Sequence, residues 1–209
     1  MKSKNLDLED SWDSPSVFKK QLELNISELS SPQSYPPHWN DFIRLVKHFK
    51  PKTILDVGCG CGALSEICNR HLGVEYTGVD YSSHAIDLAK KQWSRAHFLQ
   101  KDYKALSRKF INSFDLLHLG ALLDVLPDGD EALSRILSLS PKSVLIGRMK
   151  HTESPSFYNT YAAYGEIETY EFHHNREKFY KLCHDSSFSV NKLEENESDS
   201  YYLVNEKTI

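Results

Sequence analysis

Residues 56–62 combine an acid with three alternating glycines, a pattern that can hold a cofactor. The segment Asp56-Val57-Gly58-Cys59-Gly60-Cys61-Gly62 follows an apolar run and precedes a helical pattern. Glycine lets the backbone turn sharply and approach a ligand without a clash at Cβ. The following helix would point free N–H groups and the positive end of its dipole at that ligand. The pattern therefore predicts a strand, a glycine loop and a helix that cradle a nucleoside-bearing cofactor.

Two further acids end apolar segments that we interpret as the next strands. Asp80 lies 18 residues after Gly62, about where a nucleotide-binding unit places the carboxylate that binds ribose. Tyr81 follows it and can lie against an adenine face, and Asp102 with Tyr103 ends the strand after that. Ligands of open α/β sheets bind outside the carboxyl ends of the strands. We therefore expect these side chains to surround one site.

The order of these segments resembles the class I S-adenosylmethionine (SAM)-dependent methyltransferases. The spacing D-x-G-x-G-x-G is similar to their first motif and differs from the dinucleotide pattern G-x-G-x-x-G. Residues 113–128, with Phe-Asp-Leu-Leu followed by Leu-Pro-Asp, are similar to their fourth-strand region. The resemblance implies SAM as the cofactor and S-adenosylhomocysteine (SAH) as the product. The residues implied to bind the cofactor are Asp56, Gly58, Cys59, Gly60, Asp80, Tyr81, Asp102, Tyr103 and Gly120.

The remaining patterns predict one doubly wound, Rossmann-like α/β domain at residues 38–209. Five parallel strands are followed by a helix and a hairpin, which gives a mostly parallel sheet of seven strands with an antiparallel C-terminal strand. Residues 150–165 are predicted to be a loop with a short helix, and 167–173 a short strand or a lid segment. Residues 1–37 are predicted to be an N-terminal lid or tail, and the acidic run 194–199 a hairpin turn.

Composition favours a cytoplasmic enzyme with a small-molecule acceptor. The 209 residues have a formal net charge of −4 and no basic stripe, so nothing favours a nucleic acid partner. No apolar run approaches the ~20 residues of a membrane-spanning helix, and the charged N-terminus does not resemble a signal peptide. The four cysteines form no disulfide framework, and Cys59-x-Cys61 has no second ligand pair, so we expect no metal. The sequence assigns no oligomeric state.

The chemistry of methyl transfer leaves the catalytic residues open. The reaction is an in-line displacement from a sulfonium, so positioning of the acceptor can supply much of the rate. A general base is needed only if the acceptor must lose a proton. His118, Asp124 and His151 are candidates, but His118 also suits a packed histidine and Asp124 a helix cap.

Arg148 is the candidate for binding an anionic group of the acceptor, because it ends an apolar strand at the predicted active face. A salt bridge to Glu153 or Glu171 is the alternative. The aromatic segment that contains Tyr161 and His173 is predicted to wall the acceptor pocket. Besides an enzyme for a small O- or N-nucleophile, two functions stay open. One is a non-catalytic SAM-binding regulator, and the other is a methyltransferase for protein or RNA.

Overall fold

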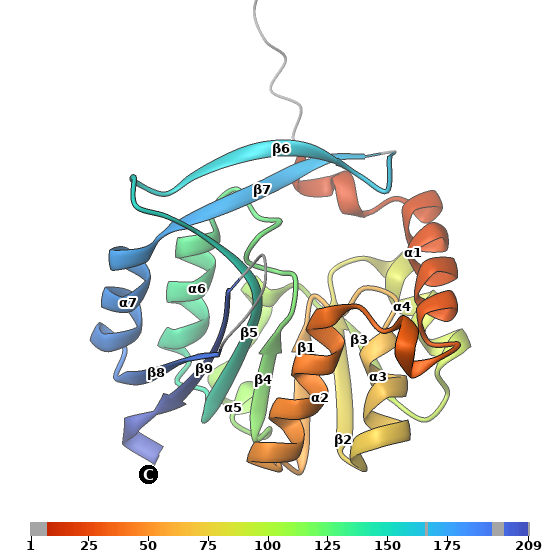
Figure 1. Ribbon diagram of the computed structural model, residues 1–209, viewed down its shortest axis with the longest axis horizontal. Helices are drawn as coiled ribbons and strands as arrows, with labels where there is room; N and C mark the ends of the chain where they lie inside the picture. The colour runs from red at the N-terminus through yellow and green to blue at the C-terminus, as the bar shows by residue number, and fades with distance from the viewer. Residues whose placement is uncertain (1–7, 166, 194–198, 209) are drawn as a thin grey trace, which may run out of the picture.

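The computed structural model describes residues 8–165, 167–193 and 199–208, and its centre is a nine-stranded sheet (Figure 1). Seven strands run in the order β3-β2-β1-β4-β5-β7-β6, while β9 pairs with β5 and with β8. The strands are β1 (Thr53–Val57), β2 (Glu75–Asp80), β3 (His97–Gln100), β4 (Leu116–Leu119), β5 (Ser143–Thr152), β6 (Phe157–Ala163), β7 (Ile167–Asn175), β8 (Phe188–Leu193) and β9 (Asp199–Asn205).

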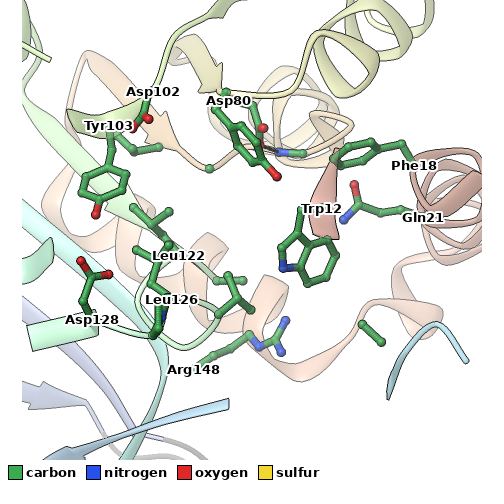
Figure 2. A pocket seen from close by; sticks show the side chains of 18 of the residues that line it. Trp12, Phe18, Gln21, Asp80, Asp102, Tyr103, Leu122, Leu126, Asp128 and Arg148 are labelled. Carbon is green, nitrogen blue, oxygen red and sulfur yellow. Dashed lines mark hydrogen bonds between the residues drawn. The ribbon is translucent and has the colours of Figure 1, made fainter. Parts of the chain in front are cut away.

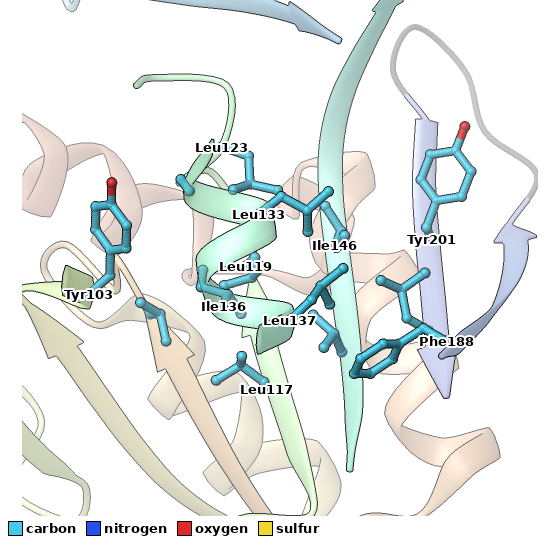
Figure 3. Packing of buried hydrophobic residues seen from close by; sticks show 14 of the residues in the cluster. Tyr103, Leu117, Leu119, Leu123, Leu133, Ile136, Leu137, Ile146, Phe188 and Tyr201 are labelled. Atoms are coloured by element: carbon cyan, nitrogen blue, oxygen red, sulfur yellow. The ribbon is translucent and has the colours of Figure 1, made fainter. Parts of the chain in front are cut away.

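Helices cover the sheet on both faces, and each face has its own apolar cluster. The helices are α1 (Pro15–Glu28), α2 (Pro37–Phe49), α3 (Ala63–Ile67), α4 (Ser83–Gln92), α5 (Arg108–Ile111), α6 (Gly129–Ser138) and α7 (Arg176–Asp185). One cluster joins α2, α3 and α4 to the sheet, and the other joins α5, α6 and α7 to the opposite face. Figure 3 shows the second cluster, where Leu133, Ile136 and Leu137 of α6 pack towards β4 and β5. Short 3₁₀ helices span Leu8–Trp12, Pro32–Ser34, Tyr103–Ala105 and Glu206–Thr208, and a π-helical turn spans Cys68–Leu72.

The mostly parallel, doubly wound sheet with an antiparallel last strand confirms the predicted fold class. β1 pairs in parallel with β2 and β4, and β9 pairs antiparallel with β5. Side chains cap the helices α4 and α7: the Ser82 hydroxyl accepts from the N–H of Ala85, and the Asn175 side chain accepts from the N–H of Lys178. The acidic turn predicted at 194–199 lies, except for Asp199, outside the described residues.

The strand count and the prediction for residues 150–165 were wrong. The sheet has nine strands rather than seven. β6 forms where a loop and a short helix were predicted, and it pairs antiparallel with β7, in the segment predicted to be a short strand or a lid. β6 is exposed at every position except its last, so it lacks the alternation of apolar and polar residues that marks a strand. Cross-strand pairs such as Tyr158 with Tyr170, whose ring centroids are 5.0 Å apart, stabilise it instead.

The β6–β7 hairpin projects over the carboxyl edge of the sheet and reaches the N-terminal segment (Figure 1). β5 pairs with β4 and β9 at its start and with β7 only from Lys150 onward. The register between β5 and β9 shifts between Ile146 and Met149, and Arg148 has a φ of +57° within that irregularity. The chain thus changes its strand partner at Arg148.

Gly62 is fixed in the glycine loop by its backbone and by its neighbour. Its φ is +75°, and a Cβ built on it would lie 2.5 Å from Cε1 of Phe98. We expect Gly62→Ala to lower the free energy of unfolding by about 2 kcal/mol. The alanine would be strained in the left-handed backbone conformation, and its Cβ would also be overpacked against Phe98. Urea unfolding followed by circular dichroism measures this loss.

Gly73→Ala is the matched control for Gly62→Ala. Gly73 has a φ of +63°, but a Cβ at this position would have nothing within 4 Å. Only the backbone strain then remains, and we expect a loss of about 1 kcal/mol. Equal losses at the two glycines would contradict the role of the Phe98 contact.

Candidate cofactor and acceptor site

A cavity of about 410 Å³ lies at the carboxyl edge of the sheet (Figure 2). Its size is that of a small-molecule site. Its walls come from the glycine loop, the ends of β2 and β3, the segment after β4, Arg148 of β5, the N-terminal segment and the β6–β7 hairpin. The lining residues are Trp12, Phe18, Gln21, Val57, Gly58, Gly60, Asp80, Tyr81, Lys101, Asp102, Tyr103, Lys104, Ala121, Leu122, Val125, Leu126, Pro127, Asp128, Arg148, Tyr161, Ala162, Ala163 and Tyr164.

Asp80 is held at the cavity wall by backbone donors. Its Oδ2 accepts from the N–H of Gly60 at 2.9 Å, and its Oδ1 accepts from the N–H of Ser82 at 3.0 Å. The side chain is buried, and this burial raises its pKa even though both N–H groups favour the charged form. The backbone of Tyr81 also favours the charged form. A carboxylate has about four lone-pair sites, so the three backbone donors still leave acceptor capacity for a ligand. The arrangement presents a fixed acceptor pair to a ligand with two adjacent hydroxyls.

The structure brings most of the predicted cofactor residues to this cavity. Tyr81, Asp102 and Tyr103 line it together with Gly58 and Gly60. The Asp102 carboxylate accepts from the N–H of Lys104 at 2.7 Å, which caps the short helix after β3. Their roles in binding stay predictions.

Three residues predicted to bind the cofactor, and the candidate base His118, do not line the cavity. Asp56 is buried, where it accepts from the Tyr76 hydroxyl at 2.5 Å and contacts Nδ1 of His118 at 2.7 Å. Cys59 and Gly120 are also absent from the lining. His118 is a packed histidine in this structure, with its ring 4.9 Å from that of Phe42 of α2. Asp56 and His118 therefore contact each other in the protein interior, outside the cavity.

Asp124 also lies outside the cavity lining, but it contacts a residue that forms part of it. Its Oδ2 lies 3.4 Å from Nη2 of Arg148, and its Oδ1 is buried without a hydrogen-bond partner among the described residues. Burial raises the pKa of Asp124. The alternative partners considered for Arg148 are engaged elsewhere, since Glu153 pairs with Arg176 and Glu171 with Lys150.

Residues of the N-terminal segment form one side of the cavity, and sequence patterns did not identify them. The indole N–H of Trp12 donates to Oγ1 of Thr169 at 2.8 Å, and the ring meets Tyr164 edge-on at 6.2 Å. Gln21 accepts from the N–H of Cys61 at 3.0 Å and donates to the Tyr164 hydroxyl at 3.2 Å. The segment therefore joins the glycine loop to the hairpin.

The hairpin contributes Tyr161 to the lining, as predicted, but not His173. The His173 ring stacks on Phe157 at 4.7 Å, and its Nε2 lies 3.0 Å from Glu171. Among the described residues, no group of three or more His, Cys, Asp or Glu side chains could hold a metal ion. No helix in the described ranges has both the length and the apolar character needed to cross a bilayer.

Comparison with known proteins finds similarity to methyltransferases. Residues 54–141 match the model of a methyltransferase domain family. This match supports a class I SAM-dependent methyltransferase. A curated relative, the ubiquinone biosynthesis O-methyltransferase of Coxiella burnetii (strain RSA 493 / Nine Mile phase I), is 36% identical over 94 residues, which are 43% of this chain and 39% of that protein. The enzyme of the same name from Nitrosomonas europaea is 28% identical over 121 residues, 56% of this chain and 47% of that protein. The match thus spans less than half of these relatives.

Solved methyltransferases share the fold of this chain. Magnesium protoporphyrin IX methyltransferase from Synechocystis PCC 6803, solved with bound SAM, superposes with a TM-score of 0.58 at 15% identity, over 95% of this chain and 90% of that one. DesVI of Streptomyces venezuelae superposes with a TM-score of 0.60 at 12% identity, over 91% and 98% of the two chains. At such identities the likeness concerns the fold alone and not the acceptor.

Proposed function

We propose that this methyltransferase binds SAM in the cavity and transfers its methyl group to a small-molecule oxygen or nitrogen nucleophile. The observation that carries the proposal is the Asp80 carboxylate, which two backbone N–H groups fix beside the glycine loop with lone pairs left for a ribose. Gly60 lets the Gln21 side chain of the N-terminal segment approach the loop, since a Cβ on Gly60 would lie 2.5 Å from it. The relatives named as O-methyltransferases support the reaction class.

The proposed mechanism relies on positioning. SAM supplies an activated methyl group on its sulfonium, so the chain has to hold and orient the two reactants. Asp80 would hold the ribose, Tyr81 would pack on the adenine, and Asp102 with Tyr103 would border the base. Because neither His118 nor Asp124 lines the cavity, we assign neither of them contact with the acceptor.

Isothermal titration calorimetry with SAM and SAH tests the proposed function. We expect both to bind with micromolar dissociation constants and a stoichiometry of one per chain. NAD⁺ is the control ligand, because the glycine spacing differs from the dinucleotide pattern. A folded protein that binds neither SAM nor SAH would overturn the proposal.

We further propose that the N-terminal segment closes the cavity as a lid. Trp12 and Gln21 support this role, since both line the cavity and both contact the β6–β7 hairpin. We expect Trp12→Ala to weaken SAH binding about tenfold, because an aromatic contact and a buried hydrogen bond are lost together. Calorimetry measures the change. Phe157→Ala is the control, as Phe157 lies on the same hairpin but not at the cavity, and SAH affinity should stay within about twofold.

We also propose a cytoplasmic location, in keeping with the thiol state of the cysteines. Cys59, Cys61, Cys68 and Cys183 are all free in the structure. Burial raises the pKa of Cys61 to about 12, which keeps this thiol protonated and unreactive at neutral pH. The negative net charge supports a small-molecule partner over a nucleic acid.

A further inference from the structure

The part of the cavity beneath the β6–β7 hairpin has one cationic side chain among aromatic ones. Arg148 lines it together with Trp12, Tyr161 and Tyr164. Figure 2 shows Arg148 directed towards Trp12 and well separated from Asp102 and Tyr103. Because Asp80 and Asp102 lie on the cofactor side, the region around Arg148 is the space left for the acceptor.

Arg148 has most of its hydrogen-bonding capacity left for a ligand. A guanidinium carries five N–H donors, and the one ion pair found for Arg148 among the described residues is a single 3.4 Å contact with Asp124. That contact is long and is not bidentate, so the guanidinium can still bind a carboxylate through two parallel N–H···O bonds. The backbone at Arg148 adopts a left-handed φ of +57° at the point where β5 changes partners. This conformation is costly for a residue with a side chain.

Asp124 positions the guanidinium without reaching the ligand. It is buried behind Arg148, and its other oxygen has no hydrogen-bond partner in the part of the chain that the structure describes. The loop that carries Asp124 is tied to the hairpin, since the Asp124 carbonyl accepts from the N–H of Phe172 at 2.9 Å. Arg148 is thus held between a buried acid and the cavity.

The aromatic side chains around Arg148 present flat apolar surfaces. The Trp12 indole N–H is already bound to Thr169, and the Tyr164 hydroxyl is already bound to Gln21. The indole N–H is thus used within the protein, while the Tyr164 hydroxyl accepts from Gln21 and keeps its own O–H as a donor. The ring faces and this hydroxyl remain for a ligand. Flat aromatic ligands pack well on such faces.

We propose that the acceptor is a flat aromatic molecule with a carboxylate, and that Arg148 binds this carboxylate while Trp12 and Tyr161 contact the ring. This inference rests on the proposed methyl transfer. Lys101 and Lys104 also line the cavity, but they flank Asp102 on the side of β3. Arg148 is therefore the cation that discriminates among acceptors.

The test compares ligands that differ only in charge or in flatness. Protein saturated with SAH is titrated with 2-naphthoate, 2-naphthamide and decahydro-2-naphthoate, and binding is followed by NMR. We expect 2-naphthoate to bind about tenfold more tightly than the neutral amide, because its bonds to the guanidinium are charge-assisted. It should also bind more tightly than the saturated acid, which cannot lie flat on the rings.

Variants locate the source of this preference. Arg148→Met should abolish the difference between naphthoate and naphthamide, and Arg148→Lys should restore part of it, because lysine keeps the charge without the two parallel N–H donors. Lys150→Met is the matched control: this neighbouring cation of β5 pairs with Glu171 and does not line the cavity, so the preference should persist.

Three outcomes would overturn the inference: equal affinity for the acid and the amide, a preference that survives in Arg148→Met, or no binding of any probe at millimolar concentration. SAH affinity is measured first on the same samples. Its absence would refute the proposed function itself, whereas SAH binding without discrimination among the probes would refute only the acceptor class.

Discussion

The Asp80→Asn protein is expected to bind SAH about 100-fold more weakly than the wild type. The two carboxylate oxygens each accept a backbone N–H, one from Gly60 and one from Ser82. An asparagine has a single oxygen, so one N–H must face an NH₂ group in either orientation. The ribose also loses one of its two acceptors. Losing two charge-assisted hydrogen bonds at about 1.5 kcal/mol each corresponds to this factor. Calorimetry with SAH measures it.

Asp102→Asn is the matched control for Asp80→Asn. Asp102 lines the same cavity, but its carboxylate accepts a backbone hydrogen bond from Lys104 alone among the described residues. An asparagine can keep that bond, and the solvent-exposed position tolerates the change. We expect a loss of SAH affinity of at most about tenfold. Comparable losses in the two variants would contradict the special role of Asp80.

The Asp130→Ala protein is expected to be about 3 kcal/mol less stable than the wild type. The Asp130 carboxylate lies 2.7 Å from Nδ1 of His174, accepts from Ser156 at 2.7 Å and pairs with Lys178 at 2.8 Å. His174 is fully buried, so removal of Asp130 leaves its Nδ1 without a partner away from water. This cluster joins α6, α7 and β7 beneath the hairpin. Thermal unfolding should show a fall of about 9 °C in Tm.

The contribution of Asp130 to stability should depend on pH. Burial alone would raise its pKa, but the bonds from His174, Lys178 and Ser156 outweigh burial and lower the pKa from 3.8 to about 2. A carboxyl with a lowered pKa in the folded state stabilises the fold above pH 3.8, and this contribution is lost as the pH falls towards 2. The stability difference between wild type and Asp130→Ala should therefore shrink between about pH 4 and about pH 2.

Asp185→Ala serves as the control for Asp130→Ala. Asp185 pairs with Lys181 at the exposed end of α7, where ion pairs contribute little. We expect its free energy of unfolding to stay within about 0.5 kcal/mol of the wild type, a value typical of surface substitutions. A loss at Asp130 no larger than that at Asp185 would show that the buried cluster does not stabilise the fold.

The parts of the site that could be predicted from the sequence depend on local geometry. The glycine loop and Asp80 follow from the fixed spacing of a strand, a turn and a helix, and neighbouring parallel strands bring their carboxyl ends to one edge. The same reasoning could not separate Asp56 from Asp80, although both end a strand. The Tyr76 and His118 contacts that turn Asp56 away from the cavity come from neighbouring strands 20 and 62 residues away.

The contacts between the N-terminal segment and the hairpin could not be predicted, because they join residues that are distant in sequence. Trp12 bonds to Thr169 across 157 positions, and Gln21 bonds to Tyr164 across 143. No local pattern encodes such pairs. The sequence placed Arg148 at the end of a strand, but the partner Asp124 belongs to the loop after β4 and depends on how that loop folds back.

The crystal structure of the protein with SAH tests the central claim most directly. The account predicts SAH in the cavity, with both ribose hydroxyls within hydrogen-bonding distance of the Asp80 carboxylate, while the Gly60 and Ser82 N–H bonds to Asp80 remain. The region beside Arg148 should stay open for an acceptor. SAH bound elsewhere, or a ribose without contact to Asp80, would contradict the account.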